Sequence, residues 1–395
     1  MKNFFFLLLI PFSSFCQNAD LEKGIHFEHG SFAELLAKAR KENKMIMADA
    51  YTTWCGPCKW MVKNIFPDDS VAAFYNKNFI NAKIDMEKGE GVGLAKKYDV
   101  ACYPTYLFID ENGKLIHRAS GGMEAKPFVE LGIAALSPEK QFASMKKKYD
   151  TGTMTADEMA AYILMKGRTC LSSKEEMAKY FPAQSDAELL QERNWNIMRE
   201  NFMNLNVESR EFQYLIKNRS EFEKKYPAGE VEMVINESYS SALFNYIKEG
   251  NNEGFKKTKD EIKKLNFTNG EELILSADME MYKSQKDWNG YGKTAIEYID
   301  KFGKEDAGLL NNTAWSFYEN ISDKTLLAKA EEWAKHAAEL HPDYASMDTY
   351  TAVLFKLGKK SEAQGAAEKA IELAKANGDD YASTAEMLEK IKAMK

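Results

Sequence analysis

Residues 48–59 read Ala-Asp-Ala-Tyr-Thr-Thr-Trp-Cys-Gly-Pro-Cys-Lys, and this stretch decides the fold of the N-terminal part of the chain. The run before it, residues 45–48, is short, apolar and preceded by polar residues, which is typical of a buried strand. Residues 59–62 begin an amphipathic helical pattern. Pro57 suits the first helical position because it has no N–H to leave unpaired there. We therefore expect Cys55 at the N-terminus of a helix that follows a buried strand.

This position predicts the chemistry of Cys55. The unpaired N–H groups and the positive dipole end of the first helical turn stabilise a thiolate, so the pKa should fall below the value of about 8.5 for a free cysteine. Cys58 lies one helical turn further along, where its sulfur is close enough to resolve a mixed disulfide formed at Cys55. The pattern predicts a thiol–disulfide oxidoreductase.

Two alternatives for the cysteine pair are half of a zinc site and a static disulfide. A zinc site needs a second pair of ligands, but the remaining cysteines stand singly and no histidines pair at ligand spacing. We therefore expect neither a metal nor a cofactor. Glycines also recur over residues 89–93, but the Gly-Lys-Ser/Thr end of a phosphate-binding loop is missing, so we expect a plain loop there.

The string from Trp54 to Lys59 resembles the active-site sequence of the thioredoxin family without a substitution. The resemblance covers residues 25–136 and implies an α/β thioredoxin fold, a central mixed sheet flanked by helices. It also implies that Asp49, five residues before Trp54, is a buried carboxylate that accepts the proton of Cys58. Within the family, this region is similar to exported domains of the DsbD-terminal type.

A second matching segment is Tyr103-Pro104-Thr105, which resembles the cis-proline segment of the family. In the family this segment faces the dithiol and pairs with the substrate backbone. The resemblance therefore implies that Pro104 docks the substrate. The residues expected to contact substrate are Trp54, Gly56, Pro57, Tyr103 and Thr105. Residues 106–118 resemble the closing β-hairpin of the fold, with an Asn-Gly turn.

The chain departs from the family at two places. Asn81 stands where many thioredoxins place a lysine near the buried carboxylate, and Lys83 lies on the same strand face at a spacing of two. The sequence leaves open whether Lys83 takes over that role. Cys102, two residues before Pro104, is an extra thiol that we expect to be exposed near the substrate surface, where it could form an intermolecular or regulatory mixed disulfide. The alternative is a buried cysteine that acts only as a small apolar residue in the packing. Cys170 is interpreted as an isolated structural residue.

Composition limits the remaining possibilities. A length of 395 residues predicts two or three units, and 29% charged with 45% hydrophobic residues is ordinary for a globular protein. The formal net charge of −7 disfavours binding to nucleic acid. Residues 1–16 combine a basic start with a short apolar run, which predicts a cleaved signal peptide. The alternative is a lipoprotein anchored at Cys16.

If the protein is exported, we expect two kinds of partner, an electron donor and protein substrates. A dithiol in a periplasmic or secreted protein needs a reductant supplied across the membrane, so we expect a membrane thiol-electron donor. The expected substrates are disulfide-containing exported proteins. The Gly-Pro dipeptide between the cysteines favours reduction or isomerisation over strong oxidation.

From residue 138 onward the pattern becomes helical. We expect antiparallel helix pairs over 138–310, with candidate helices at 188–202, 209–226, 231–248, 270–283 and 291–302. Residues 330–344 are similar to residues 363–373 at a spacing of 33, close to the tetratricopeptide period of about 34. Residues 311–395 therefore resemble tetratricopeptide repeats, whose concave face would hold a peptide or protein ligand. In the alternative function, a binding module, these helices carry the main role.

Overall fold

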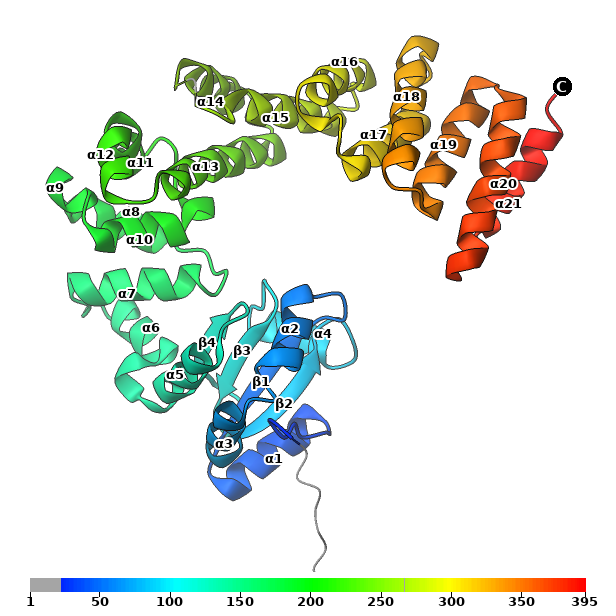
Figure 1. The fold of residues 1–395 in the computed structure, drawn as a ribbon. Coiled ribbons are helices and arrows are strands. Elements are labelled where there is room, and N and C mark those ends of the chain that lie inside the picture. The colour runs from blue at the N-terminus through cyan, green and yellow to red at the C-terminus, as the bar shows by residue number, and fades with distance from the viewer. Residues whose placement is uncertain (1–22, 266) are drawn as a thin grey trace, which may run out of the picture. The chain divides into compact units, whose positions relative to one another are not determined.

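The structure is a computed structural model that describes residues 23–265 and 267–395. The chain divides into two compact units, Met1–Asn201 and Phe202–Lys395 (Figure 1). The predicted signal peptide, residues 1–16, and with it Cys16, lie outside the described residues. Within the described ranges, no helix is long and apolar enough to cross a membrane.

The first unit is built on a mixed four-stranded sheet in the order β2-β1-β3-β4. The strands are β1 (Met45–Tyr51), β2 (Phe79–Asp85), β3 (Thr105–Ile109) and β4 (Leu115–Ser120). Strand β1 pairs in parallel with β2 and antiparallel with β3, and β3 forms an antiparallel hairpin with β4. The expected α/β fold with a central mixed sheet is confirmed.

Helices cover both faces of this sheet. They are α1 (Phe32–Glu42), α2 (Gly56–Asn64), α3 (Asp69–Asn78), α4 (Gly91–Lys97) and α5 (Ala125–Leu136). Because side chains alternate along a strand, Ala48 packs with α1 and α4, whereas Met47 packs with α2, α3 and α5. Ser31 is the N-cap residue of α1, and its side chain forms the capping box with Glu34.

The plain loop expected over residues 89–93 is wrong, because α4 begins inside it at Gly91. The backbone of Gly91 lies so close to the end of β2 that an added Cβ would come within 2.0 Å of the Asp85 carbonyl oxygen. A glycine is therefore required for close packing between helix and strand rather than for an open loop.

Seven short helical segments complete the first unit. They are η1 (Pro138–Lys140), α6 (Phe142–Asp150), α7 (Ala156–Gly167), α8 (Lys174–Tyr180), η2 (Phe181–Ala183), α9 (Asp186–Leu189) and α10 (Glu192–Glu200). Helix α6 packs on the edge strand β4 (Figure 1). The single helix expected over 188–202 is instead α9 and α10, because Gln191 between them has an extended backbone.

The second unit is entirely helical in its described residues, as expected. Its helices are η3 (Phe202–Asn204), α11 (Arg210–Lys217), α12 (Arg219–Lys225), α13 (Ala228–Glu249), α14 (Asn252–Leu265), α15 (Gly270–Ser284), α16 (Trp288–Tyr298), the π-helix Ile299–Gly303, α17 (Ala307–Asn320), α18 (Lys324–Leu340), α19 (Tyr344–Leu357), α20 (Lys360–Asn377) and α21 (Ala382–Lys392). The helix expected over 209–226 is interrupted at Asn218, between α11 and α12. From α17 to α21, each helix packs on the next one along the chain.

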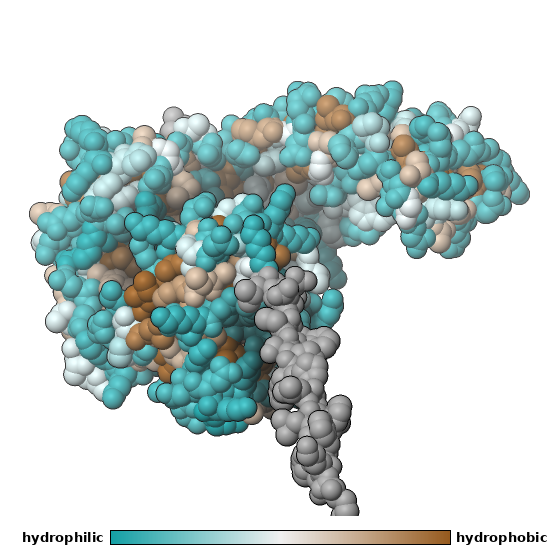
Figure 2. Space-filling view, turned by 60° about the horizontal axis from the view of Figure 1, so that its bottom comes forward, coloured by the Kyte–Doolittle hydropathy of each residue, from teal (hydrophilic) through white to brown (hydrophobic). Residues whose placement is uncertain are grey.

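One face of the molecule is predominantly polar (Figure 2). Figure 2 shows hydrophilic residues over most of the visible face, with hydrophobic residues gathered in smaller areas. Trp54 and Met203, each 65% exposed, are among the large apolar side chains on the surface. Because Trp54 directly precedes the cysteine pair, its exposure bears on the functional site.

Candidate functional site

The two cysteines of the motif lie at the start of α2. Cys55 is the N-cap residue, and the backbone N–H of Cys58 donates to Cys55 Sγ over 3.1 Å. The pair forms a disulfide, with the two Cα atoms 5.3 Å apart and each residue only 2% exposed. In the reduced state the same N–H and the helix dipole would stabilise negative charge on the Cys55 sulfur.

Trp54 connects the cysteine pair to two other segments. Its indole Nε1 donates to both carboxylate oxygens of Glu87, over 3.1 and 3.0 Å, in the loop between β2 and α4. Its ring meets that of Tyr103 edge to face, with the centroids 6.0 Å apart. The structure thus brings together the predicted residues Trp54 and Tyr103. Sequence reasoning missed Glu87, because nothing local marks this carboxylate as a partner of Trp54.

The segment before β3 is held by hydrogen bonds, two of them to residues at the end of β4. The peptide bond between Tyr103 and Pro104 is cis, and the Pro104 carbonyl accepts from the Gly121 N–H over 2.8 Å. The Thr105 hydroxyl donates to the Cys102 carbonyl over 2.7 Å and lies 2.6 Å from the Ser120 hydroxyl.

The residues expected to contact substrate differ in how exposed they are to solvent. Thr105 is fully buried, and its hydroxyl is engaged by Cys102 and Ser120, so neither its side chain nor its backbone is exposed to solvent. Gly56 and Pro57 are exposed on the surface beside Cys55. Tyr103 is half-buried.

Asp49 is a buried carboxylate on β1. It is 1% exposed, and neither of its oxygens has a hydrogen-bond partner. Burial raises the pKa of Asp49 from 3.8 to about 7, and the nearby Lys83 ammonium partly opposes this rise. The carboxylate is therefore poised to exchange a proton near neutral pH.

The structure answers the question about Lys83. The strand register places Lys83 of β2 directly opposite Asp49, and its Nζ lies 3.8 Å from Asp49 Oδ2 and 4.3 Å from the centre of the Tyr51 ring. At this separation the contact is an ion pair rather than a hydrogen bond. Asn81 is buried and donates instead to the side chain of Asn76 over 3.2 Å. Lys83 is thus the cation beside the buried carboxylate.

The expectation of a free Cys102 thiol and an isolated Cys170 is wrong. The two residues form a disulfide across 68 positions, with their Cα atoms 6.2 Å apart. Cys102 is half-buried and Cys170 is exposed, in the turn between α7 and α8. The pairing of cysteines far apart in sequence cannot be deduced from spacing, which is why the sequence did not reveal it.

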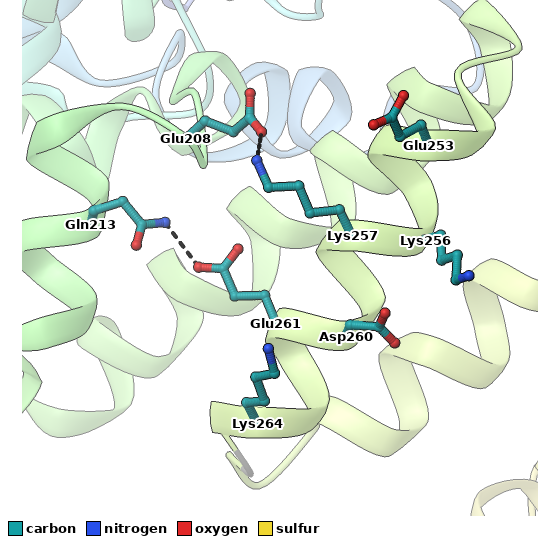
Figure 3. A pocket seen from close by; sticks show the side chains of 8 residues that line it. All are labelled: Glu208, Gln213, Glu253, Lys256, Lys257, Asp260, Glu261 and Lys264. Atoms are coloured by element: carbon teal, nitrogen blue, oxygen red, sulfur yellow. Dashed lines mark hydrogen bonds and ion pairs between the residues drawn. The ribbon is translucent and has the colours of Figure 1, made fainter.

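A cavity of about 580 Å³ lies in the second unit, and no cysteine lines it. Figure 3 shows the polar side chains around it, all but one of them charged and most of them from α14: Glu208, Gln213, Glu253, Lys256, Lys257, Asp260, Glu261 and Lys264. Several of them pair with each other, as Lys257 does with Glu208. None of these eight residues is a cysteine, serine or histidine. In the described parts of the chain, no cluster of three or more acidic, histidine or cysteine side chains fits a metal ion.

Comparison with known proteins agrees with this geometry. The model of the thioredoxin-like domain family matches residues 32–134. Thioredoxin-1 of Caenorhabditis elegans is 32% identical over 108 residues, which is 27% of this chain and 86% of that protein. The chain therefore belongs to the thioredoxin family of thiol–disulfide oxidoreductases.

Other relatives match over smaller shares of their length. Thioredoxin Y of rice is 34% identical over 110 residues, which cover 28% of this chain and 60% of that protein. The thiol:disulfide interchange protein DsbD of Yersinia pestis is 35% identical over 95 residues, which cover 23% of this chain and 16% of that protein. A solution structure of a candidate disulphide-isomerase from Bacteroides thetaiotaomicron is 44% identical over 29% of this chain and 95% of its own, with a TM-score of 0.28.

Proposed function

We propose that the protein is an exported thiol–disulfide oxidoreductase that reduces or isomerises disulfides of other exported proteins. The observation that carries the proposal is the Cys55–Cys58 pair at the N-terminus of α2, in the same domain as a buried carboxylate whose pKa is near 7. A purely structural disulfide would need neither the helix N-terminus nor an ionisable group in the core.

The proposed reaction begins with the reduced enzyme. The Cys55 thiolate attacks one sulfur of the client disulfide, which forms a mixed disulfide and releases the other client sulfur as a thiolate. Cys58 then loses its proton, and its thiolate attacks Cys55 Sγ. This step releases the second client thiolate and leaves the Cys55–Cys58 disulfide, so two electrons pass from the enzyme to the client.

The surrounding residues have proposed roles in this sequence. Asp49 accepts the proton of Cys58, because a carboxylate with a pKa near 7 can take up a proton from a buried thiol at neutral pH. Pro104 docks the client backbone. Trp54 and Tyr103, which are in edge-to-face contact, line the surface that binds the client. The exposed residues Gly56 and Pro57 lie beside them. Thr105 is buried and supports the Tyr103-Pro104 segment through the hydrogen bond that its hydroxyl donates to the Cys102 carbonyl.

Continued reduction requires a source of electrons. Each turnover leaves an oxidised pair, so a membrane thiol-electron donor must return two electrons in a compartment where disulfides persist. The Gly-Pro dipeptide between the cysteines supports the reducing direction. The periplasmic or secreted location rests on the sequence of residues 1–16.

The helical residues 311–395 are proposed to form tetratricopeptide-like repeats that bind a peptide or protein. Support comes from alanines that recur 33 positions apart in α18 and α20 and are all fully buried. These pairs are Ala330 with Ala363, Ala334 with Ala367, and Ala337 with Ala370. Equivalent small residues at this period allow neighbouring helices to approach closely, as a repeat requires. The alternative function, a binding module, would assign the main role to these helices.

A trapping experiment tests the proposed function. In Cys58→Ser, Cys55 should still attack but the mixed disulfide should persist, so mass spectrometry should identify covalently bound exported proteins. The matched control carries Cys55→Ser as well and should capture none. In parallel, wild type should reduce the disulfides of insulin, and Cys55→Ser should not. Full turnover in Cys55→Ser would remove Cys55 from the role of nucleophile.

A further inference from the structure

The Cys102–Cys170 disulfide attaches part of the helical segment to the neighbourhood of the reactive cysteines. Cys102 directly precedes Tyr103, whose ring contacts Trp54, and Trp54 directly precedes Cys55. Cys170 lies in the turn between α7 and α8. The turn is therefore held one disulfide away from the segment beside the dithiol.

A second attachment lies on the edge strand β4. The backbone N–H of Phe142, the first residue of α6, donates to Nδ1 of His117 over 3.1 Å, and both residues are buried. Burial lowers the pKa of His117 to about 4, so its ring stays neutral and accepts this hydrogen bond at neutral pH. Helix α6 is thus fixed on the open edge of the sheet.

Between the two attachments, the helical segment that follows α5 borders the sheet domain. A cavity of about 500 Å³ lies along this boundary and is lined from both sides. Tyr98, Asp99 and Arg118 line it from the sheet side, and Tyr162, Leu171 and Ser172 from the helical side. Arg118 is 2% exposed and donates to the carbonyls of Tyr98 and Asp99 over 2.8 and 3.0 Å, which holds the end of α4 at this boundary.

The clamped turn is accessible on its outer side. Arg168, Cys170 and Ser172 are exposed, whereas Thr169 and Ser173 are buried. The Thr169 hydroxyl donates to a carbonyl of α7, and the Ser173 hydroxyl donates to the side chain of Asn201 at the end of α10. At the other end of the disulfide, Tyr103 follows Cys102, and the exposed ring of Trp54 contacts Tyr103. An exposed polar turn and an exposed aromatic residue thus flank the same short segment.

We propose that the turn Arg168–Ser173, clamped by the Cys102–Cys170 disulfide, forms one wall of the surface on which an extended client polypeptide docks. The proposal rests on the proposed function. A small disulfide needs to reach only the reactive sulfur. A client in an extended conformation advances about 3.3 Å per residue, so a few residues on either side of its cysteine extend past Tyr103 and meet the turn. The wall therefore selects disulfides carried on extended protein segments.

The first test removes the clamp with Cys102→Ser and Cys170→Ser together. Kinetics are measured with insulin and with 5,5′-dithiobis(2-nitrobenzoate), a small disulfide, on enzyme whose free thiols are counted by alkylation and mass spectrometry. We expect KM for insulin to rise about three- to tenfold with kcat retained, because ground-state docking contacts are lost. The small disulfide should react within about twofold of the wild-type rate, because it makes no contact with the wall.

A second set of variants retains the Cys102–Cys170 disulfide, so a folding defect caused by its loss cannot account for their effects. Arg168→Trp and Ser172→Trp each place a bulky ring on the exposed turn, and Ala161→Trp places the same ring on an exposed position of α7. Ala161 lies six residues before the end of α7 at Gly167, about 9 Å along the helix from the start of the turn. We expect at least one turn variant to raise KM for insulin about threefold or more, and the control to match wild type.

The outcomes separate the two proposals. If the clamp variant and both turn variants match wild type with insulin, the wall is refuted while the proposed function stands. An equal loss with both substrates also refutes the wall, because the defect then lies in the dithiol itself. If wild type reduces neither substrate, the proposed function fails, and the wall fails with it.

Discussion

Replacing Asp49 with asparagine should stabilise the oxidised protein at alkaline pH. The native pKa of about 7 lies above the ordinary value of 3.8, so the folded state binds this proton more tightly than the unfolded state. The resulting stability is fully present below about pH 4 and is lost as the pH rises towards 7. A pKa difference of about three corresponds to about 4 kcal/mol. An asparagine side chain has no charge to bury, so the free energy of unfolding of Asp49→Asn should not fall in this pH range.

The measurement is the free energy of unfolding in urea at pH 5, 6, 7 and 8, read by pulse proteolysis and mass spectrometry of peptides from residues 32–134. This readout follows the thioredoxin domain separately from the helical region. We expect Asp49→Asn to exceed wild type by up to about 4 kcal/mol at pH 8, with the difference shrinking as the pH falls.

A matched control is Asp69→Asn, which removes an exposed carboxylate from the first turn of α3. Its effect should stay within about 0.5 kcal/mol at every pH. The reasoning would be refuted if Asp49→Asn were less stable than wild type at pH 8, or if the difference did not change with pH.

The same group should control the resolving step of the reaction. In wild type, the rate of release of a mixed disulfide by Cys58 should rise with a midpoint near pH 7, and this midpoint should be absent in Asp49→Asn. Lys83→Met should move the midpoint to higher pH, because it removes the cation that opposes the raised pKa of Asp49. Stopped-flow kinetics of attack and release test this. A slower attack by Cys55 with unchanged release would contradict the assignment of Asp49.

Two further predictions concern stability. Removing the Cys102–Cys170 disulfide from the oxidised protein should lower the free energy of unfolding of the first unit by about 4 kcal/mol, from the entropy of closing a loop of that length; an unchanged urea midpoint would contradict it. Gly91→Ala should destabilise the domain by about 2 kcal/mol or more, since its Cβ would collide with the Asp85 carbonyl, whereas Gly93→Ala, with open space around it, should be neutral or stabilising by up to about 1 kcal/mol. Thermal unfolding of the two glycine variants decides between these results, and equal melting temperatures would refute the close approach at Gly91.

Features that depend on a few neighbouring residues could be predicted from the sequence alone. The apolar run before the motif and Pro57 after Cys55 predicted the strand and the helix N-terminus, because both signals act within a few residues. Ser31 and Glu34 determined where α1 begins for the same reason. The alternation along β1, which divides Ala48 and Met47 between the two faces of the sheet, follows from strand geometry alone.

Contacts between residues far apart in the sequence could not be predicted in this way, because they depend on how the elements pack. The pairing of Asp49 with Lys83 depends on the register between β1 and β2, and the pairing of Cys102 with Cys170 depends on where α7 ends beside the sheet. In each case a side chain finds its partner through the packing of separate elements, and packing energy is summed over many contacts that no short pattern records. The electrostatic environment of Asp49 and the wall beside the dithiol are therefore products of the fold as a whole.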